Sequence, residues 1–415
     1  MNTSERTRLP GTVLLLCLSQ IVGSLGLAAG ATAGPLLAEL ITGSAAYGPT
    51  AMGALVTGSA LAGPAAGTIM RRLGRVWGPA ACNLCATAGA AVVVFSVNWG
   101  LASLLLGTVL LGAGTTGVML GRYLATDLVD ERRAPQAMGL AVAAVTVGAV
   151  LGPVLLGPTG VVAEAAGLPP QTGLHLLAVV VFPLASLILL RLRGGGGPEA
   201  PATGTPASGR GTGRLLPLLV LGTGNLSMVA IMGSVPNHLQ HSGWDLQAVG
   251  MFAALHIGAM FAFAPVSAAL CRRFGPRTVA PAAALCMTGS LAFGVLGGGV
   301  GSDLALLALV GVSWNLHLVS GSMWLVEVTP EPLRNRAEGL GELAMGAAAA
   351  AGSLGLAGPL LSLGGLPLLC LAMAAVNVAT AVALAARARS RRTPAAPAPV
   401  SAVSADSPSR DLPRP

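Results

Sequence analysis

The stretch GTIMRRLGR, residues 67–75, ends an apolar run, and part of it recurs in the second half of the chain. RRLG at 71–74 returns as RRFG at 272–275, an offset of 201 residues. ERRAPQAMGL at 131–140 returns as EPLRNRAEGL at 331–340, an offset of 200 residues. Two loops that repeat at nearly one offset indicate a duplicated structural unit. The chain is therefore expected to contain two copies of one fold.

The composition is that of a polytopic membrane protein. Of the 415 residues, 53% are hydrophobic and 9% are charged, and the mean hydropathy is +0.77. A helix needs about 20 mostly apolar residues to cross about 30 Å of hydrocarbon. Twelve such runs are present, at 11–38, 50–70, 77–97, 100–121, 137–158, 173–192, 215–235, 248–270, 278–298, 304–325, 338–360 and 366–386. The predicted fold class is an all-α membrane protein of twelve transmembrane helices in two pseudo-symmetric six-helix bundles.

The basic residues predict the orientation. All 23 are Arg, and they fall in alternate loops. Loops rich in Arg are retained on the cytoplasmic side, so both termini are expected to be cytoplasmic. The net charge of +8 is then a topology signal and an attraction to anionic lipid, so the bilayer is a partner and nucleic acid is not.

Two segments divide the chain. Residues 193–214 are rich in Gly, Pro, Ala and Thr and are predicted to form a flexible cytoplasmic linker. It joins an N-terminal bundle at 1–192 to a C-terminal bundle at 215–386. The tail at 387–415 is predicted to be disordered, with its first Arg cluster on the inner lipid surface.

The loop quoted first resembles the motif between helices two and three of the major facilitator superfamily. Gly67, Arg72, Gly74 and Arg75 stand in matching places, and the resemblance extends over essentially the whole chain. It implies a transporter fold and a gating role for these four residues. The usual Asp of the motif is replaced by Arg71, which leaves open whether the charge interaction that latches the outward-open state operates here.

The segment GAVLGPVLLG at 148–157 resembles the helix-five motif of proton-coupled drug exporters. Close helix packing by small residues explains the same pattern. A proton-driven exporter normally needs a carboxylate or His relay inside the membrane. The carboxylates near the membrane segments are expected toward helix ends; they are Glu39, Asp303, Glu327, Glu338 and Glu342.

Two consecutive apolar segments each carry a pair of soft metal ligands. MVAIM holds Met228 and Met232, and HIGAM holds His256 and Met260. Residues four apart lie on one face of a helix, so each segment is expected to present both side chains together. With one helix running outward and the next inward, Met228 is expected about 10 Å and His256 about 12 Å below the outer face. These two residues would then be nearly level.

The donor set predicts the metal. Thioethers and one imidazole suit Cu(I) far better than Zn(II), Mn(II) or Mg(II). The two motifs resemble those of CcoA-type copper importers, which bring copper into the bacterial cytoplasm for assembly of haem-copper oxidases. That resemblance implies a ligand role for Met228, Met232, His256 and Met260. Two alternatives stay open: gap-filling by the Met side chains, and a structural His bonded to a backbone carbonyl or to Asn225.

Further residues could form a second shell or a path for copper. His238 and His241 are expected just outside helix seven, where they could collect the ion. Cys82 and Cys85 are expected nearer the cytoplasmic side, where they could receive Cu(I) as a thiolate pair. The remaining polar candidates near the path are Asn225 and His317.

The predicted function is import of Cu(I) by alternating access of the two bundles. Copper is the transported substrate and no cofactor is expected; a cytoplasmic copper chaperone is a candidate partner. The sequence shows no nucleophile or metal-hydrolase motif, so an enzyme is not expected. The alternatives are a proton-coupled small-molecule or drug exporter, and a membrane protein that senses or donates copper without moving it.

Overall fold

A computed structural model describes residues 11–130, 133–192, 212–330 and 334–390. These residues are helical throughout, apart from short connections, and no strand occurs among them. An apolar segment in lipid must satisfy its backbone hydrogen bonds internally, and the α-helix does this within one segment. The predicted linker, except for its last three residues, and most of the predicted tail lie outside the described residues.

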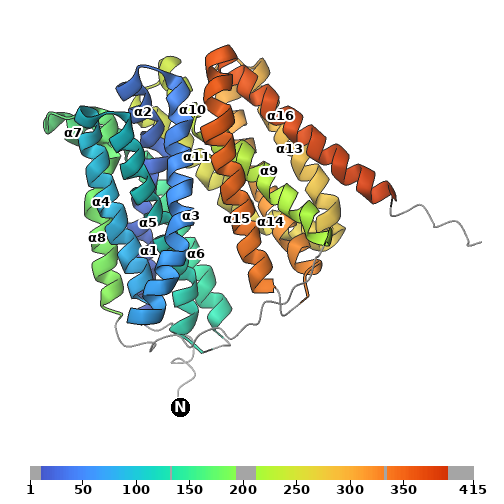
Figure 1. The fold of residues 1–415 in the computed structure, drawn as a ribbon, viewed down its shortest axis with the longest axis horizontal. Coiled ribbons are helices and arrows are strands. Elements are labelled where there is room, and N and C mark those ends of the chain that lie inside the picture. The colour runs from blue at the N-terminus through green and yellow to red at the C-terminus, as the bar shows by residue number, and fades with distance from the viewer. Residues whose placement is uncertain (1–10, 131–132, 193–211, 331–333, 391–415) are drawn as a thin grey trace, which may run out of the picture.

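The first bundle is shown at the left of Figure 1. A π-helical turn at Ala29–Ala33 interrupts its first span, and a kink at Leu155 separates α6 from α7. Its helices are α1 (Gly11–Leu25), α2 (Gly34–Thr42), α3 (Gly48–Leu73), α4 (Trp77–Trp99), α5 (Leu101–Asp127), α6 (Ala134–Val154), α7 (Leu156–Ala165) and α8 (Gly173–Leu190).

The second bundle lies beside the first and repeats its organisation. A π-helical stretch at Ala351–Ala357 joins its last two helices. Its helices are α9 (Leu215–Met232), α10 (Val235–His241), α11 (Leu246–Ala262), α12 (Ala264–Phe274), α13 (Pro276–Leu296), α14 (Val300–Glu327), α15 (Arg334–Ala350) and α16 (Gly358–Ser390).

The described chain contains eleven helical segments long and apolar enough to cross a membrane. The last of them, Gly339–Arg387, has 49 residues, a rise of about 73 Å, which is more than twice the thickness of the hydrocarbon core. Its helix is broken at Gly364 and Gly365, and Gly365 has a φ of 65°. This break divides the segment into two crossings, so the predicted twelve-helix fold is confirmed.

The repeated loops adopt the same local conformation in both bundles. The helix α3 ends at Leu73 and is followed by Gly74 with a φ of 104°. The helix α12 ends at Phe274 and is followed by Gly275 with a φ of 80°. Positive φ is readily available only to glycine, so the shared Gly of RRLG and RRFG turns the chain after each helix.

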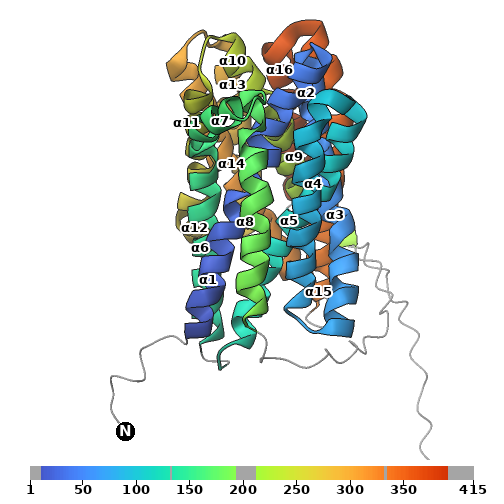
Figure 2. The same ribbon diagram turned by 90° about the vertical axis from the view of Figure 1, so that its left-hand side faces the viewer.

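The two ends of the molecule differ. We call the end that carries Arg71, Arg72 and Arg75 the inner end, and the opposite end the outer end. Figures 1 and 2 place α2, α7 and α10 together at the outer end. Across the bundles, α3 packs against α15, and α6 packs against α11.

Candidate functional site

His256 lies in the middle of α11, where 1% of its surface is exposed. Its Nδ1 is 2.8 Å from the carbonyl oxygen of Leu307 in α14. A carbonyl oxygen only accepts, so Nδ1 carries the proton and Nε2 keeps its lone pair. Nε2 is buried and has no hydrogen-bond partner among the described residues. A metal-binding His usually donates its second ring nitrogen to a carbonyl in this way.

Local sequence explains how α11 reaches this position. The helix is capped by Asp245, whose carboxylate accepts a hydrogen bond of 2.8 Å from the backbone N–H of Ala248. Gly311 of α14 allows the two helices to approach closely. A Cβ at that residue would lie 2.6 Å from the carbonyl oxygen of His256 and 3.2 Å from the backbone nitrogen of Met260. The turn from His256 to Met260 is therefore held directly against α14.

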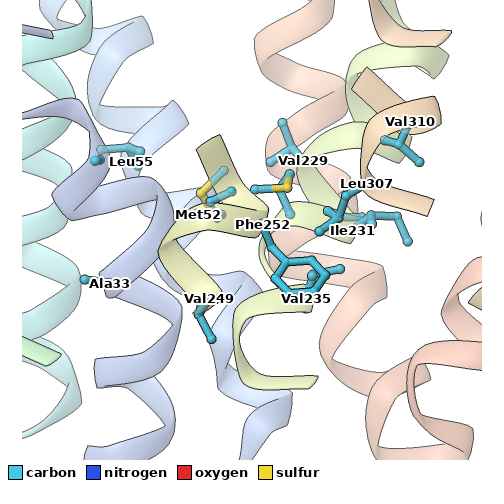
Figure 3. Packing of buried hydrophobic residues seen from close by; sticks show 14 of the residues in the cluster. Ala33, Met52, Leu55, Val229, Ile231, Val235, Val249, Phe252, Leu307 and Val310 are labelled. Atoms are coloured by element: carbon cyan, nitrogen blue, oxygen red, sulfur yellow. The ribbon is translucent and has the colours of Figure 1, made fainter. Parts of the chain in front are cut away.

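The Met pair of α9 belongs to the same apolar cluster. Met232 and Met260 are buried in it, with exposed fractions of 4% and 8%, and the partly buried Met228 packs against it. Figure 3 shows part of this cluster, including Val229 and Ile231 of α9 and Leu307 and Val310 of α14. Helices α9 and α11 both pack on α14. The structure thus places Met228, Met232 and Met260 in one apolar cluster, on two helices that share α14 as a neighbour.

The vertical register differs from the sequence prediction. The seventh span continues through α10 to His241, beyond the predicted end at residue 235. Counted from the outer helix ends, Met232 lies about 14 Å deep and His256 about 15 Å deep. Met228 and Met260 both lie about 20 Å deep. By this count Met232, rather than Met228, is expected to be level with His256, with Met228 one turn further in.

His238 and His241 lie on α10, within the seventh span and not just outside it as predicted. Nε2 of His241 is 2.5 Å from Oε1 of Glu39 in α2, and Nε2 of His238 is 3.6 Å from Oδ1 of Asp303 in α14. Both His side chains line one hollow of about 270 Å³ at the outer end. The pair of Glu39 with His241 also joins the two bundles there.

Asn225 and His317 make contacts between and within helices. The Nδ2 of Asn225 donates to the carbonyl oxygen of Met345 at 2.9 Å, and its Oδ1 accepts from Nε1 of Trp314 at 2.9 Å. His317 is buried, and its Nδ1 is 2.8 Å from the carbonyl oxygen of Ser313. Asn225 therefore fixes α9 to α14 and α15. It is not the partner of His256, since that partner is the Leu307 carbonyl.

Replacing Asn225 with Leu is expected to lower the free energy of unfolding by about 1–3 kcal/mol, because the N–H of buried Trp314 would lose its acceptor. Thermal unfolding of the purified protein in detergent, followed by tryptophan fluorescence, measures this. Asn98→Leu, at an exposed residue of α4, is the matched control and should leave the unfolding midpoint in place. Equal midpoints for both variants would show that the Asn225 bonds carry no net stability.

Cys82 and Cys85 lie on α4 within the first bundle. They pack near Ala66 of α3 and Ala113 of α5. Neither thiol is among the residues that line the hollows described here. The structure therefore does not bring them to the ligands on α9 and α11.

A cavity opens between the bundles toward the inner end. It has two lobes of about 650 Å³ and 760 Å³, which share Tyr123 of α5 and Gly339, Glu342 and Met345 of α15. Asn225 lines the outer part of the first lobe together with Leu55 and Val56 of α3. Glu342 was expected near a helix end, and its place in a cavity was not predicted.

The outer end is closed. Helices α6 and α11 meet so closely that a Cβ on Gly250 would overlap the carbonyl oxygen of Pro153. Asn237 of α10 donates from Nδ2 to the carbonyl oxygen of Pro35 in α2 at 3.1 Å. A cavity open at the inner end and packed helices at the outer end define an inward-open state.

Most of the sequence matches a known family. Residues 16–314 match the sequence profile of the Major Facilitator Superfamily. The chain belongs to this superfamily. Two relatives from Bacillus subtilis (strain 168), the uncharacterized MFS-type transporters YddS and YdeG, are each 29% identical to it. Both alignments cover 82% of this chain, with 83% of YddS and 84% of YdeG.

Solved superfamily structures share the fold. The POT family transporter PepTSo aligns with a TM-score of 0.71 at 13% identity, over 92% of this chain and 98% of its own. A D-xylose-proton symporter aligns with a TM-score of 0.69 at 15% identity, over 90% of this chain and 96% of its own. A bacterial homologue of the iron transporter ferroportin, in an inward-facing state, aligns with a TM-score of 0.68 at 17% identity, over 92% of this chain and 100% of its own. The chain is thus a multi-pass membrane transporter, and its cavity lies between the bundles.

The superfamily's loop motif has a specific arrangement here. Arg75 pairs with Asp127 at the end of α5, with 2.5 Å between Nη1 and Oδ1. Arg71, which replaces the usual Asp, donates from Nη2 to Oγ1 of Thr68 at 3.0 Å. Gly67 faces the Arg71 guanidinium, and Arg72 is exposed on the last turn of α3. The contact of Arg71 with Thr68 and the ion pair of Arg75 with Asp127 both lie within the first bundle.

Proposed function

We propose that this superfamily transporter imports Cu(I) across the bacterial cytoplasmic membrane, with Met228, Met232, His256 and Met260 as successive ligands. The observation that carries the proposal is the imidazole of His256. Its Nδ1–H is bound to the Leu307 carbonyl, and its Nε2 lone pair is buried without a partner. Leaving such a group unpaired costs free energy, and a metal ion would satisfy it.

The surrounding donors favour Cu(I). Across the parts of the chain that the structure describes, no three His, Cys, Asp or Glu side chains gather as metal ligands. Divalent Zn and Mn prefer such donors, whereas neutral thioethers with one imidazole suit Cu(I). The two-level arrangement, Met232 with His256 and Met228 with Met260, would pass the ion inward by about one helical turn.

Residues outside the ligand motifs support an entry point for copper at the outer end and an exit at the inner end. The hollow lined by His238 and His241 lies at the outer end, where it could collect copper. The roof of the inner cavity lies at Asn225, one turn inward from Met228. Copper would leave through this cavity to the cytoplasm, where a copper chaperone could accept it. Cys82 and Cys85 do not lie on this path, so we assign them no part in release.

Competition between metals tests the substrate class. Copper accumulation by cells that express the protein should be inhibited by excess Ag(I), which shares the soft-ligand preference of Cu(I). Excess Zn(II) or Mn(II) should leave it unchanged. Radiolabelled copper in copper-limited, reducing medium provides the readout, with protein level controlled by immunoblot. Inhibition by Zn(II) equal to that by Ag(I) would contradict the soft-ligand site.

Export of a small hydrophobic molecule is the second candidate. The inner cavity favours it, because lobes of about 650 Å³ and 760 Å³ with largely apolar walls exceed the needs of a single ion. The helix-five motif gives little support for export, because close helix packing explains it: its Pro153 packs against Gly250 of α11. The export function predicts that Met228→Leu and His256→Gln retain transport of a hydrophobic cation.

A further inference from the structure

We infer a second, inner Cu(I) site in the cavity between the bundles, formed by Met119 of α5 with Glu342 and Met345 of α15. The inference rests on the proposed function, because it identifies where the ion is held after it leaves the ligands on α9 and α11. It adds three residues that neither the ligand motifs nor the loop motif contains.

The two helices present matching faces to one space. Met119 and Tyr123 are four residues apart on α5, and Glu342 and Met345 are three apart on α15, so each pair lies on one face. All four side chains line the 650 Å³ lobe. In Figure 1, α15 lies on the side of the second bundle that faces the first. The site therefore takes ligands from both bundles.

The charge in the cavity favours a cation. Among the described residues that line the two lobes, Glu342 alone has a charged side chain. Its side chain is exposed to the cavity, and none of the described residues forms an ion pair with it. A carboxylate between low-dielectric walls raises the local concentration of cations. A monovalent ion bound there gives a site with no net charge.

The donor types suit a site that releases the ion. Two thioethers select a soft ion such as Cu(I), while a carboxylate oxygen is a hard donor that Cu(I) binds weakly. The inner site should therefore hold Cu(I) less tightly than the imidazole of His256. A weaker second site on the cytoplasmic side is what an importer needs for exit.

The inner site adjoins the predicted ligands. Asn225 lines the same lobe, and Met228 and Met232 follow it by three and seven residues, along the same face of α9. They lie about 5 Å and about 10 Å further outward. Asn225 also donates its amide hydrogen bond to the backbone of Met345. An ion leaving Met228 thus reaches the cavity beside the residue that carries one of the inner ligands.

Copper stoichiometry tests the inner site. The full-length protein, purified in detergent under reducing and oxygen-free conditions, is titrated with Cu(I) against a chromogenic Cu(I) chelator. The wild type should bind two Cu(I), the His256→Gln variant one, and the double variant Met119→Leu/Met345→Leu one. Leu conserves the volume of Met, so the double variant should fold. Met251→Leu, at an exposed residue of α11, is the matched control and should bind two.

The outcomes separate the inner site from the proposed function. One possible result is that the wild type binds one Cu(I), which is lost in His256→Gln and kept in the double variant. This result would overturn the inner site without contradicting the proposed import function. Binding lost in the double variant and unchanged in His256→Gln would support the inner site and contradict the ligand role of His256. Absence of binding in the wild type would overturn both.

A second variant guards against misfolding. Glu342→Gln changes an exposed side chain and should fold as the wild type does. Removing its charge should weaken the lower-affinity Cu(I) by about tenfold, through loss of one close charge interaction. Unchanged affinity for that ion would overturn the part assigned to Glu342.

Discussion

Replacing His256 with Gln should lower copper accumulation by about 100-fold, because removal of a neighbour of a metal ligand already costs 10- to 100-fold in affinity. Gln can still donate a hydrogen bond to the Leu307 carbonyl, but it offers no imidazole nitrogen to Cu(I). The helix contact should therefore survive while the ligand is lost. Radiolabelled copper in copper-limited cells measures the effect, with protein level controlled by immunoblot.

The matched control for this variant is His175→Gln. His175 is fully buried on α8 in the first bundle and lies outside the ligand motifs. The two variants make the same substitution at equally buried residues, so His175→Gln reports any general cost of replacing a buried His. Accumulation that falls equally in both variants would indicate a structural effect. Accumulation that stays normal in His256→Gln would contradict the ligand role.

Replacing Gly250 with Ala should lower transport at least about tenfold while copper binding is kept. The new methyl group would overlap the Pro153 carbonyl where α6 and α11 close the outer end. A backbone group cannot move away as a flexible side chain can, so the inward-open state should be disfavoured by more than about 1.4 kcal/mol, which is tenfold in population. Transport by alternating access requires that state.

The same helix provides the control. Gly258 of α11 has open space where a Cβ would be added, so Gly258→Ala should transport normally. A cysteine placed at Ser59, which lines the inner cavity, reports the state through a membrane-impermeant thiol reagent added from the inner side. Labelling should fall in Gly250→Ala and stay at the wild-type level in Gly258→Ala. Unchanged labelling and transport in Gly250→Ala would contradict the assignment of α6 and α11 as the outer closure.

Much of the fold is predictable from the sequence, because hydropathy and Arg placement act over whole segments. The two glycines of RRLG and RRFG indicated the repeat correctly, and both have positive φ. The extension of the seventh span was missed. The predicted span ended at residue 235, but Pro236 lies in the first turn of α10, where a missing backbone N–H costs nothing, and the helix resumes.

One feature of the candidate site was predictable from spacing. His256 and Met260 lie four residues apart, so they were expected to share one face of the helix, and both are buried. The register between α9 and α11 was not predictable, because it depends on where α10 ends. Spacing along the chain also could not predict the Leu307 carbonyl as the partner of His256, or Met119 and Glu342 as cavity residues. Only packing brings these distant segments together.

The most direct test of copper import is uptake of Cu(I) by proteoliposomes that contain the purified protein and enclose a Cu(I) indicator. We expect a time-dependent signal with the wild type, and a signal near that of empty liposomes with His256→Gln. This pair of results would establish that the protein moves the ion and that His256 is on its route. Wild-type liposomes that bind copper but show no more internal signal than empty ones would contradict import and favour a protein that only binds or senses copper.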